Sequence, residues 1–197
     1  MSLFIAMFSF ALAMSISPGP VNMIIVSSGA SYGVRKTTPF VSGATIGLVS
    51  LLLFIGLGFS KVIDLYPNFL SYLEVAGSLF IIYMGYLIAS SKPELDIKKQ
   101  KQPTFIQGCL LQWLNPKAWI ACVAGVSMFS EANNNHIFLS FVFIYFIVCY
   151  LSLFSWSLLG SKVTLFLNNE LRLKVFNLFM GCLLILTACY LLYTQFS

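Results

Sequence analysis

The stretch Ser17-Pro18-Gly19-Pro20-Val21-Asn22 interrupts the first long apolar run of the chain, residues 3–28. Two prolines and a glycine in three positions remove two backbone donors and disfavour helical conformations in the residues that precede the prolines. Inside a bilayer, such a break is tolerated only where it is buried against protein or lines a wet cavity. If this run crosses a membrane, we expect residues 17–22 to line a site.

A second break, Asn115-Pro116-Lys117, interrupts a later apolar run, residues 105–129. A lysine near the middle of a membrane costs at least ~2.5 kcal/mol on insertion scales, so Lys117 needs a compensating partner. We interpret the two breaks as one site, in which Lys117 is the partner of a bound carboxylate or a proton-linked charge. A structural bond from Lys117 to carbonyl groups freed by a break is the alternative.

The composition indicates that lipid surrounds the protein. The chain has 197 residues, of which 59% are hydrophobic and 9% are charged, and its mean hydropathy is +0.91. A soluble domain carries about a quarter charged residues. The net charge of +5 comes from basic residues in short segments between apolar runs, so membrane topology explains it better than binding to nucleic acid.

Six apolar runs reach the roughly 20 residues that a membrane-spanning helix needs. They cover residues 3–28, 38–60, 67–90, 105–129, 137–160 and 173–194. The connections are short, and the sequence has no Gly-x-x-x-x-Gly-Lys loop that would hold a nucleotide phosphate. The sequence predicts an all-α integral membrane protein, with one domain of six transmembrane helices over residues 1–197.

The charged segment at residues 91–104 divides the six helices into halves at about 1–90 and 105–197. Because each half has three crossings, the second half enters the membrane from the opposite side, which is the geometry of a 3+3 inverted repeat. Each half opens with a helix broken at proline, the first and the fourth. Paired interruptions in corresponding helices indicate the binding site of a transporter.

The distribution of Lys and Arg predicts the orientation. Nine of them fall in the segments after the first, third and fifth runs: Arg35, Lys36, Lys92, Lys98, Lys99, Lys101, Lys162, Arg172 and Lys174. The opposite side has only Lys61. The positive-inside rule then places both termini outside and residues 91–104 in the cytoplasm. Four tyrosines suit an outer aromatic belt: Tyr66, Tyr72, Tyr190 and Tyr193.

Small residues recur at the spacing that lets transmembrane helices approach closely. Gly29 and Gly33 are four residues apart at the end of the first run, and Gly43 and Gly47 are four apart in the second. We expect these glycines to serve helix packing rather than to contact a substrate.

A helix that restarts after Pro20 exposes free N–H groups with a partial positive charge, suited to a carboxylate. We expect these donors to belong to Asn22 and Met23, and carbonyls near residues 13–15 to receive an ammonium group. Asn115 has both donors and an acceptor and can serve the site or cap the break. Glu74, the one acid clearly inside an apolar run, is either an interfacial residue or a second candidate for proton coupling.

Two groups of motifs resemble signatures of the LysE/RhtB amino-acid exporters. The first comprises Ser17-Pro18-Gly19-Pro20, Ser28-Gly29-Ala30-Ser31-Tyr32-Gly33-Val34-Arg35-Lys36 and Gly43-Ala44-Thr45-Ile46-Gly47; the second comprises Gln107-Gly108 and Leu114-Asn115-Pro116-Lys117-Ala118-Trp119. The resemblance extends to length, helix count and motif order, and is greatest to the homoserine, threonine and cysteine efflux branch. It implies export of amino acids or close derivatives across the cytoplasmic membrane, driven by the proton motive force.

The same resemblance implies no ATP, no prosthetic group and no enzymatic activity. The expected partners are a small amino acid, protons and lipid, with a homo-oligomer possible. The expected substrate-binding residues are Ser17, Pro18, Gly19, Pro20, Asn22, Asn115, Pro116 and Lys117. Since no acid is placed to pair with a cationic side chain, small neutral amino acids are favoured over lysine or arginine.

Two other classes of function stay open. A divalent metal-ion exporter of related fold would need a cluster of His, Cys or carboxylate side chains, and the chain has a single histidine, His136. A membrane enzyme could use Ser17 as nucleophile with Lys117 as base. A redox carrier would need paired cysteines, but the five here form no Cys-x-x-Cys pair: Cys109, Cys122, Cys149, Cys182 and Cys189.

Overall fold

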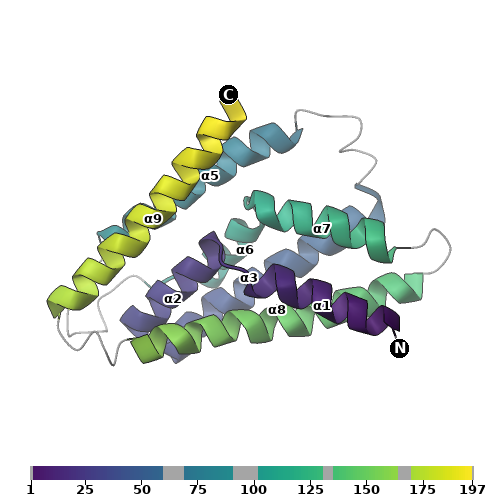
Figure 1. Cartoon of the computed structure of the whole chain (residues 1–197), viewed down its shortest axis with the longest axis horizontal. Coiled ribbons are helices and arrows are strands. Elements are labelled where there is room, and N and C mark those ends of the chain that lie inside the picture. Colours follow the sequence, from purple (N-terminus) through teal and green to yellow (C-terminus); the bar gives the residue numbers. More distant parts are fainter. Residues whose placement is uncertain (1, 60–68, 91–101, 131–134, 164–169, 197) are drawn as a thin grey trace.

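The computed structural model describes residues 2–59, 69–90, 102–130, 135–163 and 170–196 (Figure 1). Every regular element in these ranges is a helix. In chain order they are α1 (Ser2–Ile16), α2 (Pro20–Tyr32), α3 (Val34–Phe54), η1 (Ile55–Phe59), α5 (Phe69–Ala89), α6 (Phe105–Trp113), α7 (Pro116–Phe129), α8 (Asn135–Val163) and α9 (Glu170–Phe196).

The helix lengths indicate a multi-pass membrane protein. Three helical segments are long and apolar enough to cross a bilayer, Val34–Gly58, Asn135–Val163 and Leu171–Tyr193. The bent pair α1 and α2 makes a fourth if it counts as one span. Length alone does not give the six spans that the sequence predicts, because α6 and α7 are separate short helices and the described part of α5 begins at Phe69.

The helices pack in a pattern that relates the two halves of the chain. Helices α1 and α2 lie against α8, and α6 lies against α3. Helices α5 and α9 pack mainly on each other and run side by side along one edge of the molecule (Figure 1). Asn177 of α9 is buried and bonds through its amide to the hydroxyls of Ser27 and Ser31 on α2, so a polar contact ties this pair to the rest.

Glycines lie where the helices cross most closely. A Cβ at Gly29 of α2 would lie 2.5 Å from the carbonyl oxygen of Ser157 on α8. A Cβ at Gly43 of α3 would overlap the backbone of Phe105, and one at Gly47 would lie 2.8 Å from the carbonyl oxygen of Cys109. Gly33 differs from these three. It has nothing within 4 Å of a Cβ position, and its φ of +78° indicates a role in the turn between α2 and α3.

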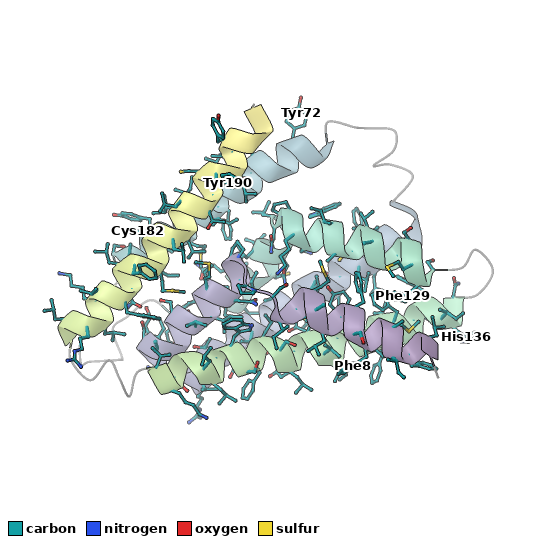
Figure 2. The ribbon with its side chains drawn as sticks, viewed as in Figure 1. Phe8, Tyr72, Phe129, His136, Cys182 and Tyr190 are labelled. Atoms are coloured by element: carbon teal, nitrogen blue, oxygen red, sulfur yellow. The ribbon has the colours of Figure 1, made fainter. Side chains whose placement is uncertain are left out.

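The outer surface is apolar, as lipid contact requires. Phe8 on α1 and Tyr190 on α9 are exposed by 50% and 66%, and Figure 2 shows them on opposite sides of the molecule. Tyr72 and Tyr190, which the sequence assigns to an aromatic belt, both project from the α5 and α9 pair (Figure 2). Tyr66, Lys61, Lys92, Lys98, Lys99 and Lys101 lie outside the described residues.

Candidate functional site

The first break separates α1 from α2. Helix α1 ends at Ile16, Gly19 is extended with φ −172° and ψ 176°, and α2 begins at Pro20. The two helices are bent by 62°. Because Pro18 has no N–H group, the carbonyl of Met14 has no donor from the following turn, and it accepts instead from the Ser17 hydroxyl at 3.2 Å.

Asn22 bridges this break with its side chain. Its amide Nδ2 donates to the carbonyl oxygen of Ser15 at 3.1 Å and to that of Ser17 at 3.0 Å. Asn22 is 5% exposed, so the two bonds form away from bulk solvent. Asn22 therefore satisfies carbonyl groups that the break removes from the helical hydrogen-bond pattern.

The second break separates α6 from α7, and its backbone groups find partners locally. Asn115 caps α7, since its Oδ1 accepts from the backbone N–H of Lys117 at 3.1 Å. The backbone N–H of Asn115 donates to the carbonyl of Gln112 at 3.3 Å. The indole N–H of Trp119 donates to the carbonyl of Trp113 at 2.7 Å.

Lys117 joins the second break to the first. Its Nζ donates to the carbonyl oxygen and to the hydroxyl oxygen of Ser17, both at 2.8 Å, and lies 3.5 Å from the carbonyl oxygen of Pro18. A Cβ at Gly19 would lie 3.4 Å from the same Nζ, so the lysine chain passes close to the extended backbone there. The structure thus brings together Ser17, Pro18 and Gly19 with Lys117.

The two breaks differ in the donors that they leave free. At the start of α2 the first backbone bond runs from the N–H of Met23 to the carbonyl of Gly19, at 3.0 Å. The unpaired N–H groups therefore belong to Val21 and Asn22, and the expectation that Met23 supplies one is wrong. At the start of α7 the side chain of Asn115 already occupies the N–H of Lys117, so of these two described helix starts the one with open backbone donors is that of α2.

A cavity of about 30 Å³ lies between the two breaks. A water needs roughly 10–15 Å³ of such space, so the cavity has room for about two waters and is too small for an amino acid. Its walls come from α1, α2, α3, α6, α7 and α8 and the two breaks: Met14, Ser15, Gly19, Val21, Asn22, Leu48, Gln112, Asn115, Lys117, Ala118, Ala121, Tyr145, Cys149 and Leu153. Lys117 is the one charged residue among these described residues.

The residues predicted for the site take different places around this cavity. Gly19, Asn22, Asn115 and Lys117 line it. Pro20 and Pro116 are the first residues of α2 and α7, where the missing N–H costs no helical bond. Glu74 belongs to α5, and its side chain lies outside the described part of the structure.

Leu48 and Tyr145 are among the cavity residues that sequence reasoning missed. The carbonyls of residues 13–15 were expected at the site, and of these residues Met14 and Ser15 line the cavity. Leu48 and Tyr145 lie inside continuous apolar runs, and nothing in those runs marks them. Only the packing of α3 and α8 around the breaks identifies these two.

The arrangement bears on the two other classes of function. Within the described residues, no group of three or more His, Cys, Asp or Glu side chains is placed to hold a metal ion. The Ser17 hydroxyl contacts both the Met14 carbonyl and the Lys117 ammonium. A protonated lysine has donors and no acceptor, so in that form Lys117 donates to the Ser17 oxygen.

Comparison with known proteins agrees with the motifs. The family model described as LysE type translocator matches residues 12–195. The cysteine/O-acetylserine efflux protein of Escherichia coli strain K12 is 32% identical over 126 residues, which cover 63% of this chain and 64% of that protein. The protein of the same name from Shigella flexneri serotype 5b is 33% identical over the same length and shares of the two chains.

The chain thus spans about 64% of the length of the curated relatives that it matches. No solved structure matches it. The match to the family model extends over almost the whole chain, and the resemblance read from the two groups of motifs is confirmed. The chain belongs to the family of LysE type translocators.

Proposed function

We propose that this protein is a secondary exporter of small amino acids or their derivatives across the cytoplasmic membrane, driven by the proton motive force. The observation that carries the proposal is the bond between Lys117 and Ser17, which joins two helix breaks at a cavity inside an apolar helix assembly. The relatives named as cysteine/O-acetylserine efflux proteins support an amino-acid substrate.

The groups at the cavity suit the two charges of an amino acid. The substrate carboxylate accepts hydrogen bonds from the Lys117 ammonium and from the free N–H groups of Val21 and Asn22, at the positive end of α2. The substrate ammonium donates hydrogen bonds to the carbonyl oxygens of Ser15 and Ser17. These carbonyls now accept from Asn22 and Lys117, so substrate binding exchanges internal bonds for equivalent bonds to the ligand.

This exchange explains how a cation is kept inside the membrane when no substrate is bound. Without a substrate, Lys117 is stabilised by three oxygen atoms of the first break. When a carboxylate arrives, it competes with Ser17 for the ammonium. The cavity of about 30 Å³ must widen at that step.

The helix packing supports a 3+3 inverted repeat of six spans. In this arrangement α1 with α2 and α6 with α7 are the broken first helices of the two halves, α3 and α8 are the second, and α5 and α9 are the third. The first helix of each half packs on the second helix of the other half, and the two third helices pack on each other. The pattern of helix contacts is the same when each helix of one half is replaced by the corresponding helix of the other half, as an inverted repeat requires.

Topology and proton coupling complete the proposal. We assign both termini to the outside, on the distribution of Lys and Arg, and residues 1–197 to one domain. Lys117 is the first candidate for the coupled proton, because it is the charged residue at the cavity. Glu74 is the second. The alternative, a divalent metal-ion exporter, has no supporting cluster within the described residues.

The experiment is an efflux assay in intact cells loaded with a panel of amino acids: serine, cysteine, threonine, alanine and lysine. Cells that express the protein should export the small neutral members faster than cells with an empty vector, and lysine no faster. A protonophore should abolish this export while ATP is maintained. Export of none of the panel would refute the proposed substrate class, and export that survives the protonophore would refute the proton coupling.

A further inference from the structure

Within the described residues, the buried hydroxyl of Ser15 has no oxygen or nitrogen hydrogen-bond partner, and its polar neighbour is the Cys149 thiol, which is only a weak donor and acceptor. Several serines and threonines described in these helices donate to a carbonyl of their own helix; Thr45, Ser140 and Ser155 are examples. Ser15 does not, although it is 7% exposed and lies in the wall of the cavity. A buried hydroxyl without a partner destabilises the protein, so its presence at this wall calls for a ligand or a water.

Two further polar side chains line the same cavity without a partner. Gln112 of α6 is 5% exposed and Tyr145 of α8 is 1% exposed. Within the described residues, neither the Gln112 amide nor the Tyr145 hydroxyl forms a hydrogen bond. The ring of Tyr145 packs against those of Phe10 and Phe141, with centroid distances of 6.2 and 5.4 Å, so the position of its hydroxyl is fixed by the core.

We infer that Ser15, Gln112 and Tyr145 form a subsite that binds the side chain of the exported amino acid and selects side chains with an uncharged polar group. This inference rests on the proposed function and adds to it. The residues that would hold the substrate's charged groups, Lys117 and Asn22, are already engaged with the backbone of the first break. The three unpartnered groups are therefore left for a different part of the ligand.

The other cavity residues limit which side chains fit. Leu48, Ala118, Ala121 and Leu153 supply apolar walls, and no carboxylate is found among the described residues that line the cavity. A cationic side chain would therefore enter without a counter-charge. An apolar side chain of equal size would leave the three polar groups unpaired, which is the condition under which a site rejects an analogue that lacks a hydroxyl.

The test compares two amino acids of nearly equal size, serine and 2-aminobutyrate, which differ by a hydroxyl in place of a methyl group. The ratio of their efflux rates is measured for the full-length protein and for Ser15→Ala, Gln112→Met and Tyr145→Phe. The natural protein should favour serine. Each variant should lower the ratio about fivefold, the typical effect of one neutral hydrogen bond. Because the ratio is taken on one protein, the amount in the membrane does not affect it.

Two matched variants serve as controls. Ser155→Ala removes a hydroxyl that is bonded to its own helix. Tyr150→Phe removes the hydroxyl of a tyrosine on α8 that does not line the cavity. Both should keep the natural ratio. Use of three subsite variants keeps the test decisive if one of them fails to fold.

The outcomes separate the two proposals. If the natural protein exports amino acids and all the folded subsite variants keep its serine preference, the subsite is refuted and the exporter stands. The same holds if the control variants lower the ratio as much as the subsite variants do. If the natural protein exports neither amino acid nor any of the panel, the proposed function itself is refuted.

Discussion

The ammonium group of Lys117 lies 2.8 Å from both the carbonyl oxygen and the hydroxyl oxygen of Ser17, a residue one hundred positions earlier in the chain. Each residue supplies the hydrogen-bonding groups that the other lacks. Ser17 belongs to a break whose carbonyls lack helical donors, and Lys117 is a cation that needs acceptors in an apolar surrounding. The two breaks stabilise each other as long as the contact holds, and in the proposed mechanism a substrate that separates them takes over both roles.

The first prediction concerns topology. In a background without the native cysteines, single cysteines at Ser130, the exposed C-cap of α7, and at Ser90, the exposed residue after α5, should label differently from outside the cell. With both termini outside, Ser130 faces the exterior and Ser90 faces the cytoplasm. A membrane-impermeant maleimide on intact cells should therefore react at Ser130→Cys alone. Reaction at Ser90→Cys in sealed cells would show that the orientation is the opposite of the one proposed.

The second prediction concerns helix packing at Gly43. A methyl group at this position would overlap the backbone of Phe105 on α6, and backbone atoms cannot move aside without separating α3 from α6. Gly43→Ala should therefore reduce the amount of folded protein in the membrane. The control Ile46→Ala changes a residue of α3 that is 46% exposed, and its membrane abundance should stay near normal. Equal abundance of the two variants would contradict the close crossing.

The third prediction concerns Asn22. The variant Asn22→Leu removes the donor to the carbonyls of Ser15 and Ser17. Ser17 keeps its bond from Lys117, whereas the Ser15 carbonyl loses its side-chain donor. We expect the free energy of unfolding to fall by about 1–3 kcal/mol, the cost of an unsatisfied buried acceptor, measured as a lower thermal transition in detergent.

Thr38→Val is the control for Asn22→Leu. It removes a hydroxyl that donates to the carbonyl of Val34 within α3 at 3.0 Å. That carbonyl keeps its helical environment, so the thermal transition should shift little. A similar shift in both variants would mean that the side chain of Asn22 contributes no more than an ordinary helical hydroxyl.

Local chemistry in the sequence explains much of this structure. The prolines and Gly19 account for the end of α1 at Ile16 and the start of α2 at Pro20, since they remove donors and disfavour helical conformations. The apolar runs account for the helices. The helix continues past residue 28 to Tyr32, because Gly29 packs on α8 and Ser31 bonds to Asn177 of α9 instead of facing lipid.

The composition of the cavity could not be predicted in the same way. That Lys117 finds Ser17 depends on how α7 lies across the first break, and no local pattern reports a contact between residues one hundred positions apart. Tyr145 occupies one position in a long apolar helix with several aromatic residues. Its place at the cavity follows from the rotation of α8 against α1 and α3, which side-chain packing determines.

The last prediction tests whether Lys117 serves transport or only structure. Lys117→Met keeps much of the side-chain length and removes the charge and its donors. The Ser17 carbonyl still accepts from Asn22, so the first break keeps a partner and membrane abundance should stay near normal. If Lys117 binds the carboxylate or carries the coupled proton, serine efflux per molecule of protein should fall at least about tenfold, as expected when a charged hydrogen bond is lost. Lys162→Met, which removes an exposed charge from the last turn of α8, should export normally. If Lys117 is purely structural, the efflux of Lys117→Met should fall only in proportion to the amount of protein in the membrane. Near-normal efflux per molecule of Lys117→Met would exclude Lys117 from the transport site.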